Sequence, residues 1–146
     1  ETLAAVPMPV LGDARLAVEL NAGADAPRFV GRVIEGVDAS VPTPVWMAQR
    51  LQRGGVRPVS LLVDVTQHVM LELGQPMHAY DRDLLQGPLG VRHARPGETL
   101  ALLNGDEATL DPQFLVITDA DRVVGLAGIM GGADTKVSAT TRNVML

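Results

Sequence analysis

The hydrophobic pattern of the chain changes from helical spacing to strand-like spacing near its middle. Residues 44–53 and 59–73 carry apolar side chains at intervals of three and four, the spacing of helices that bury one face. Residues 29–37 alternate branched apolar residues with polar ones, which predicts a strand. Beyond residue 89 the apolar runs are short and separated by turn residues. Helices followed by strands, without βαβ alternation, predict an α+β fold with a mixed or antiparallel sheet.

Turn residues set the expected ends of the two helices. Thr43 can cap a first helix that begins at Pro44, and Gly54-Gly55 can end it. The second helix is predicted over Val59–Leu73. Four of its residues form one apolar stripe: Leu62, Val65, Val69 and Leu73. Its polar residues lie mainly on the other face: Ser60, Asp64, Gln67 and His68.

The remaining elements are predicted to be short strands. A leading segment over residues 1–26 contains an alternating run, Leu16–Leu20, that suits an edge strand. Hairpin turns are predicted at Asn104-Gly105 and at Asp119–Arg122. The other strands are expected at Gly90–Ala94, Leu100–Leu103, Thr109-Leu110, Phe114–Thr118, Val123–Ile129 and Asn143–Leu146.

Composition narrows the class of protein. Hydrophobic residues make up 47% of the chain but only four are aromatic, so the core must be aliphatic. The absence of cysteine excludes disulfides and cysteine-ligated zinc, and it suits a reducing cytosol. A net charge of −5 and a single lysine, Lys136, disfavour strong electrostatic binding of nucleic-acid phosphates. No apolar run approaches the roughly 20 residues of a membrane span, and the first residues lack the charged and apolar regions of a signal peptide.

His78 is the most informative candidate for chemistry. It lies in the segment Gly74–Asp81, Gly-Gln-Pro-Met-His-Ala-Tyr-Asp, where glycine and proline predict an irregular and fixed backbone. Rigid segments of this kind often carry binding and catalytic residues. The competing interpretation is a structural histidine that is hydrogen-bonded in the wall of the core.

Two further positions have both a structural and a functional interpretation. Thr66 interrupts the apolar stripe of the second helix, where its hydroxyl either bonds the carbonyl of Leu62 or faces a pocket. Gly128 lies where a strand runs into a double glycine, either as part of a turn or as a pocket wall. The glycine spacing fits no phosphate-binding motif, and the paired acids Asp119 and Asp121 suit turn chemistry. No metal-binding motif is present in the sequence.

The ordered segments Arg57–Asp81 and Leu126–Gly132 resemble the central editing domain of the β subunit of bacterial phenylalanyl-tRNA synthetase. Residues 29–37 and 42–51 resemble the segments that precede them in that family. The resemblance covers residues 27–146, which would form the editing domain without its C-terminal part. It implies an α+β fold in which a β-sandwich-like sheet packs with two main helices.

The function implied by the resemblance is hydrolysis of tyrosine that has been attached wrongly to tRNA(Phe). An apolar synthetic pocket rejects an added hydroxyl by only about a hundredfold, so a second site must remove the wrong product. The whole enzyme would use ATP and magnesium to attach phenylalanine to tRNA(Phe), whereas this domain would need no cofactor. Its expected partners are the acceptor end of tRNA(Phe) and the α subunit of a cytoplasmic α2β2 tetramer, with no membrane involved.

The resemblance carries roles to individual residues. His78 matches the histidine beside the aminoacyl ester and is the expected catalytic residue. The expected substrate-binding residues are Thr66, Gln67, Pro76 and Gly128. Thr66 would lie beside the bound amino acid, and Gly128 would leave room for its ring. Pro76 would belong to the same wall, and Gln67 replaces the asparagine usual in the family.

The resemblance leaves open the role of His78 and the activity of this chain by itself. A positioned water would hydrolyse the ester without metal or covalent intermediate, and His78 would either orient the reactants or act as a general base. The family places a glutamate that receives the tyrosyl hydroxyl directly after the last strand, where this chain ends at Leu146. The chain by itself is therefore expected to be a weak hydrolase. The alternative function is a non-catalytic RNA-contact or scaffold module.

Overall fold

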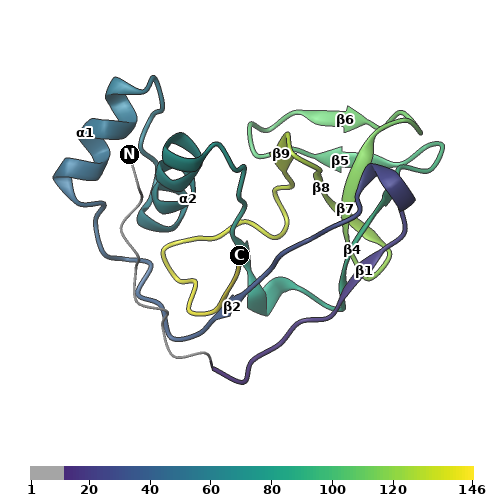
Figure 1. Ribbon diagram of the computed structural model, residues 1–146, viewed down its shortest axis with the longest axis horizontal. Coiled ribbons are helices and arrows are strands. Elements are labelled where there is room, and N and C mark those ends of the chain that lie inside the picture. The colour runs from purple at the N-terminus through teal and green to yellow at the C-terminus, as the bar shows by residue number, and fades with distance from the viewer. Residues whose placement is uncertain (1–11) are drawn as a thin grey trace.

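The computed structural model describes residues 12–146, with the two helices on one side and most strands on the other (Figure 1). The α-helices are α1 (Val45–Arg53) and α2 (Leu61–Leu73), and short 3-10 turns cover Gly23–Asp25 and Arg82–Leu84. The strands are β1 (Val18–Leu20), β2 (Val33–Ile34), β3 (Tyr80–Asp81), β4 (Leu89–His93), β5 (Thr99–Ala101), β6 (Glu107–Thr109), β7 (Leu115–Asp119), β8 (Arg122–Leu126), β9 (Met130–Gly131) and β10 (Val144–Met145). The predicted α+β class is confirmed.

Three sheets organise these strands. The largest has the order β1-β4-β7-β8-β9, in which β1 is parallel to β4 and the other pairs are antiparallel. The second has the order β2-β10-β3 and the third is the hairpin β5-β6. The sheet is therefore mixed, as the sequence predicts, and β1 forms its edge. Both predicted hairpin turns are confirmed, one joining β5 to β6 and the other joining β7 to β8.

Two local predictions are wrong. Of residues 29–37 only Val33–Ile34 form a strand, because the partner β10 offers two residues and Gly36 then turns with φ +69°. Helix α1 begins at Val45 with Pro44 in the cap position, and no side chain caps it. The Thr43 hydroxyl donates instead to the carboxylate of Asp64 on α2.

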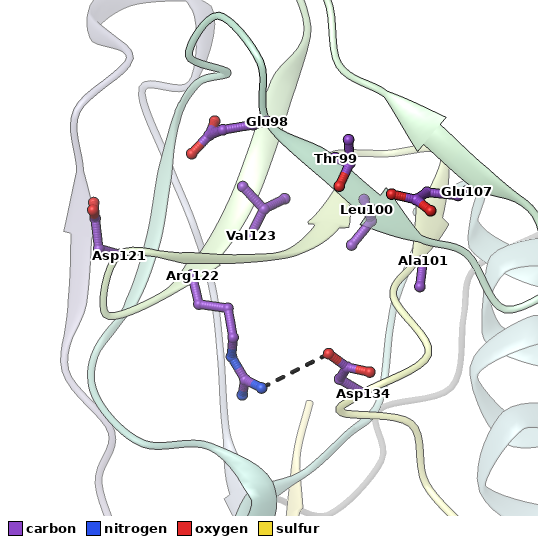
Figure 2. Close-up of a pocket in the computed structure, with 9 residues that line it drawn as sticks. All are labelled: Glu98, Thr99, Leu100, Ala101, Glu107, Asp121, Arg122, Val123 and Asp134. Atoms are coloured by element: carbon purple, nitrogen blue, oxygen red, sulfur yellow. Dashed lines mark ion pairs between the residues drawn. The ribbon is translucent and has the colours of Figure 1, made fainter.

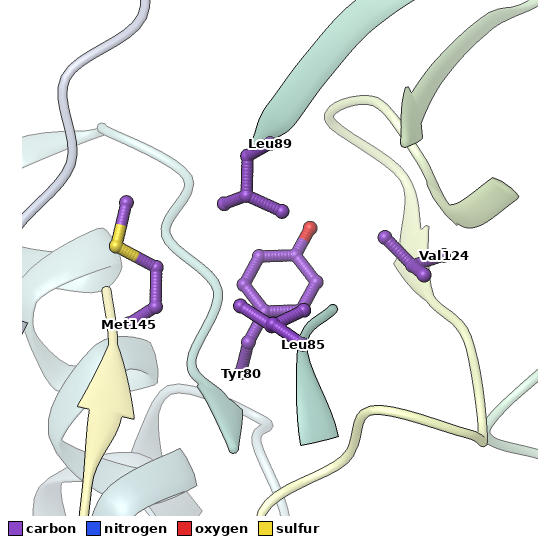
Figure 3. Close-up of a cluster of buried hydrophobic side chains, with 5 residues drawn as sticks. All are labelled: Tyr80, Leu85, Leu89, Val124 and Met145. Atoms are coloured by element: carbon purple, nitrogen blue, oxygen red, sulfur yellow. The ribbon is translucent and has the colours of Figure 1, made fainter. Parts of the chain in front are cut away.

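The core is divided into two clusters of buried side chains. The first contains Tyr80, Leu85, Leu89, Val124 and Met145, with the ring of Tyr80 enclosed by the aliphatic groups (Figure 3). The second contains Ala94, Leu100, Leu110 and Val116. Both are built mainly from aliphatic side chains, and Tyr80 is their one aromatic member. Because β3 supplies Tyr80 and β10 supplies Met145, the small central sheet is fixed to the large one through the first cluster.

Helix α2 buries two polar side chains and leaves part of its apolar stripe exposed. Asp64 and Thr66 are 1% and 4% exposed, whereas Val65 and Leu73 are 39% and 54% exposed. The Asp64 carboxylate accepts hydrogen bonds from the Val59 amide at 2.8 Å and from the Thr43 hydroxyl. This buried carboxylate on α2 therefore holds both the segment that leads into α1 and the loop between the two helices. Neither helix of residues 12–146 has the length and apolar character needed to cross a bilayer.

Replacing Asp64 tests how much the hydrogen bonds to its carboxylate contribute to the free energy of unfolding. Asp64→Ala leaves the Val59 amide and the Thr43 hydroxyl without their acceptor, and each buried donor left unpaired costs about 1–3 kcal/mol. We expect the free energy of unfolding in urea to fall by about 3 kcal/mol. The control Asp38→Ala removes an exposed carboxylate that bonds Ser40 and should change stability by less than about 1 kcal/mol. Equal losses in both variants would contradict the assignment.

Candidate functional site

The segment that carries His78 joins helix α2 to the central strand β3. Gly74 ends α2 in the left-handed region at φ +71°, and its amide donates to the carbonyl of Met70. The chain then runs without repetitive structure until Tyr80–Asp81 pairs with Val144–Met145. The backbone of this segment is irregular, as its glycine and proline predict, and it is anchored at both ends.

The imidazole of His78 is held between an aromatic ring and a glycine backbone. The ring of Tyr80 meets it edge-on, with centroids 4.4 Å apart and planes at 74°. On the strand β9, a Cβ atom at Gly131 would overlap the imidazole. Any side chain at Gly131 would therefore displace His78. The structure thus identifies Tyr80 and Gly131 as neighbours of His78 that the sequence analysis did not assign to the site.

Burial sets the charge state of this pair. Desolvation lowers the pKa of His78 below its ordinary value of 6.5 and raises the pKa of Tyr80. His78 is therefore mainly neutral at pH 7. Its Nε2 atom is buried and has no hydrogen-bond partner among residues 12–146. That orphaned nitrogen does not fit the interpretation of a histidine that is hydrogen-bonded in the core wall, since such a residue would have its ring nitrogens satisfied.

The two helix-borne candidates differ in burial, since Thr66 is buried and Gln67 is half-buried. The Thr66 hydroxyl donates to the carbonyl of Val63 at 2.7 Å, so the local helix bond forms with Val63 rather than with Leu62. This bond uses the hydroxyl hydrogen and leaves the oxygen able to accept. Gln67 follows it in the helix and is half-buried.

The two loop-borne candidates are exposed. Pro76 lies two residues before His78, and Gly128 lies in the turn between β8 and β9 with φ +70°. That turn is closed by the Ile129 amide donating to the carbonyl of Leu126 at 3.1 Å. Gly128 thus forms a turn, whereas the glycine against the imidazole is Gly131. The glycine of this segment that contacts the imidazole is therefore Gly131, and the role of Gly128 towards a bound ring stays a prediction.

Two surface cavities lie away from His78. The larger, of about 390 Å³, is bounded by β5 and β8 (Figure 2). Its acidic side chains are largely neutralised, because Glu98 pairs with Arg92, Asp121 pairs with Arg95, and Asp134 lies 4.0 Å from Arg122. The other, of about 220 Å³, lies beside β2. Neither is lined by a predicted site residue, and residues 12–146 contain no group of acids and histidines arranged to hold a metal ion.

The charge state of His78 can be tested by following the titration of its imidazole by NMR. Because burial disfavours the imidazolium, we expect a midpoint below 6.5. Tyr80→Leu removes the ring that covers the imidazole and should raise the midpoint towards 6.5, whereas Tyr80→Phe keeps the ring and should leave it unchanged. Loss of the signal in His78→Asn assigns it among three histidines. A midpoint at or above 6.5 in the unaltered chain would contradict the burial argument.

The sequence matches a known domain family and several known proteins. The B3/4 domain family matches residues 25–146. The phenylalanine–tRNA ligase β subunit of Xanthomonas campestris pv. campestris (strain 8004) is 72% identical over 131 residues, which cover 90% of this chain and 17% of that protein. The β subunit of Xylella fastidiosa (strain Temecula1) is 60% identical over 139 residues, which cover 95% of this chain and 18% of that protein. The chain therefore spans less than a fifth of the length of these relatives.

Structural comparison supports the same fold. An N-terminal fragment of the phenylalanyl-tRNA synthetase β subunit from Pyrococcus horikoshii superposes with a TM-score of 0.67, over 96% of this chain and 44% of the fragment. At 16% identity this likeness concerns the fold alone, and it confirms the α+β arrangement expected from the sequence. With the family matching nearly the whole chain and curated relatives up to 72% identical to it, the chain belongs to the B3/4 domain family.

Proposed function

We propose that this chain is the corresponding segment of a phenylalanine–tRNA ligase β subunit and that the surroundings of His78 hydrolyse tyrosine from mischarged tRNA(Phe). The identity to β subunits over nearly the whole chain supports the first part. The whole enzyme would be a cytoplasmic α2β2 tetramer that uses ATP and magnesium for aminoacylation. Those groups would serve its other parts, and the hydrolysis proposed here uses neither.

The observation that carries the editing proposal is the buried Nε2 atom of His78, which has no partner among residues 12–146. A neutral imidazole can hold a water molecule or the ester of a bound substrate at a ring nitrogen. The Nε2 atom is covered where the imidazole packs against Gly131, so substrate would have to displace that contact to reach it, while Tyr80 keeps the plane of the ring fixed. Such preorganisation is what a site needs in order to align a water with an ester carbonyl.

The lowered pKa of His78 bears on how it would act. A base with a pKa below 6.5 is unprotonated at pH 7, but it takes up a proton from water less readily than an ordinary histidine. We therefore assign His78 the role of orienting the water or the ester rather than that of a strong general base. Of the two roles that the sequence leaves open, the lowered pKa favours positioning.

The remaining site residues would form the walls of the amino-acid pocket. The oxygen of Thr66 can still accept a hydrogen bond, because its hydrogen is used within α2, so it suits the ammonium group of the aminoacyl ester. Gln67, which follows Thr66, would offer its amide. The exposed residues Pro76 and Gly128 would approach the substrate from the two loops that flank His78 and Gly131.

The central test uses the full-length β chain assembled with its α subunit. His78→Ala should slow deacylation of Tyr-tRNA(Phe) by at least about a hundredfold, because it removes the group that positions the reactants. Formation of Phe-tRNA(Phe) should keep its normal rate. The matched control His93→Ala changes an exposed histidine on β4 that pairs with Asp25 and should leave both rates unchanged. Normal clearance of Tyr-tRNA(Phe) by His78→Ala would favour the scaffold or RNA-contact interpretation.

A second test concerns the glycine that the structure adds to the site. Gly131→Ala places a methyl group where the imidazole lies, so His78 must move. We expect deacylation to fall by at least about tenfold while aminoacylation is retained, since displacement of an aligned group by about 1 Å is costly. The control Gly12→Ala introduces a methyl group with no atom nearby. Deacylation at the normal rate in Gly131→Ala would show that the position of His78 is unimportant.

A further inference from the structure

The segment of residues 39–63 is basic in a chain that is acidic as a whole. It contains three arginines, Arg50, Arg53 and Arg57, and no aspartate or glutamate. The complete chain has a net charge of −5, so its acidic residues are concentrated outside this segment. All three arginines are exposed. The low net charge of the whole chain therefore conceals one positively charged region.

Helical spacing places Trp46, Arg50 and Arg53 on one side of α1, since they are four and three residues apart. Trp46 is 52% exposed, and the guanidinium of Arg50 lies over its ring, 5.4 Å from the centroid. After Arg53 the chain folds back on the helix, because the Val56 amide donates to a carbonyl in the last turn of α1 at 2.9 Å. Arg57 therefore stays close to the end of α1. We call the surface of Trp46 and the three arginines the basic face.

Two of these positive charges are not neutralised within the described fold. Arg50 lies 3.6 Å from the exposed carboxylate of Glu72, so that pair adds little net charge. Neither Arg53 nor Arg57 forms an ion pair within residues 12–146. Arg53 complements the dipole of α1 from its last turn, but Arg57 lies beyond the helix and has no such role. The basic face can therefore bind an external anion through Arg53 and Arg57.

The basic face lies beside the end of α2 that leads to His78, as the packing of the two helices in Figure 1 shows. A Cβ atom at Gly54, directly after α1, would lie 2.9 Å from the side chain of Leu71 in the last turn of α2. His78 follows four residues after Gly74, where α2 ends, so these two residues are at most about 14 Å apart. A phosphate-bearing polymer whose end is bound at His78 can therefore reach the basic face.

We propose that the basic face binds the RNA next to the aminoacylated end of the tRNA, with phosphates at Arg53 and Arg57 and an unpaired base against Trp46 and Arg50. The planar guanidinium matches phosphate oxygens in two hydrogen bonds. Exposed aromatic rings and guanidinium planes are surfaces on which unpaired bases stack. An acidic protein surface would match the charge but offers no flat base for the tryptophan, so RNA is the better fit. The proposal rests on the proposed function, because it concerns the substrate that His78 would hydrolyse.

The test removes two charges in the full-length β chain assembled with its α subunit. Arg53→Gln/Arg57→Gln should lower kcat/KM for deacylation of Tyr-tRNA(Phe) by at least about tenfold at about 0.1 M salt, since two phosphate contacts are lost. The slope of log kcat/KM against log salt concentration should become shallower by about one to two, because fewer counterions are released on binding. A merely structural role would not change this slope. Aminoacylation should keep its normal rate.

The matched control Arg28→Gln/Arg95→Gln removes the same charge from exposed residues that adjoin the large sheet. Arg95 lies between β4 and β5, and Arg28 lies three residues after Asp25, which pairs with His93 on β4. The control should leave both kcat/KM and its salt dependence unchanged. An equal effect in the two double variants, or no effect in either, would overturn the proposal.

Photocrosslinking gives a readout that does not depend on hydrolysis. Benzoylphenylalanine replaces Gln49, an exposed residue beside Arg50 on α1, and replaces Phe114, which is 45% exposed, as the control. We expect crosslinks to the tRNA from position 49 with a yield at least about tenfold above that from position 114, since bound RNA would cover only the first. Products with protein in place of tRNA, or equal yields at the two positions, would overturn the proposal.

The two measurements together separate this proposal from the editing function. Crosslinks from position 49 to tRNA in an enzyme that does not deacylate Tyr-tRNA(Phe) would retain the basic face and reject editing. Normal deacylation by Arg53→Gln/Arg57→Gln, without such crosslinks, would retain editing and reject the basic face.

Discussion

The contact between the ring of Tyr80 and its neighbours joins the hydrophobic core to the candidate site. On one side the ring packs with Leu89, Val124 and Met145, which belong to three strands of two different sheets. On the other side its edge meets the imidazole of His78. A core with few aromatic groups concentrates much of its buried area in such a ring. The position of His78 therefore depends on the same packing that holds the two sheets together.

Buried carboxylates supply the other constraints on the fold. Asp64 ties the helices, Asp81 accepts from the Thr141 hydroxyl at 2.6 Å, and Asp119 accepts from the amides of Gln86 and Gly87. Burial by itself would raise the pKa of Asp119, but hydrogen bonds from the guanidinium of Arg122 and from these amides lower it overall. Asp119 is therefore ionised at neutral pH. Each carboxylate fixes a loop that has little regular structure, so the chain holds its shape with short strands and modest apolar clusters.

Helix α2 carries two of the candidate residues and leads directly into the segment of His78. Thr66 is buried and Gln67 is half-buried, whereas Val65 and Leu73 are exposed.

The sequence determined the α+β class, the two helices, both hairpin turns and the edge strand, because spacing and turn residues act locally. It also singled out His78 as a candidate, since glycine and proline around a rare histidine are visible without a structure. Tertiary structure alone decided that Gly131 rather than Gly128 lies against the imidazole, and that Thr43 bonds Asp64 instead of capping α1. Each of these contacts joins residues that are far apart in the sequence. A local sequence pattern does not say which distant residues come together. The same reason explains why Asp64, predicted on the polar face of α2, is buried, since spacing defines a face but not what that face meets.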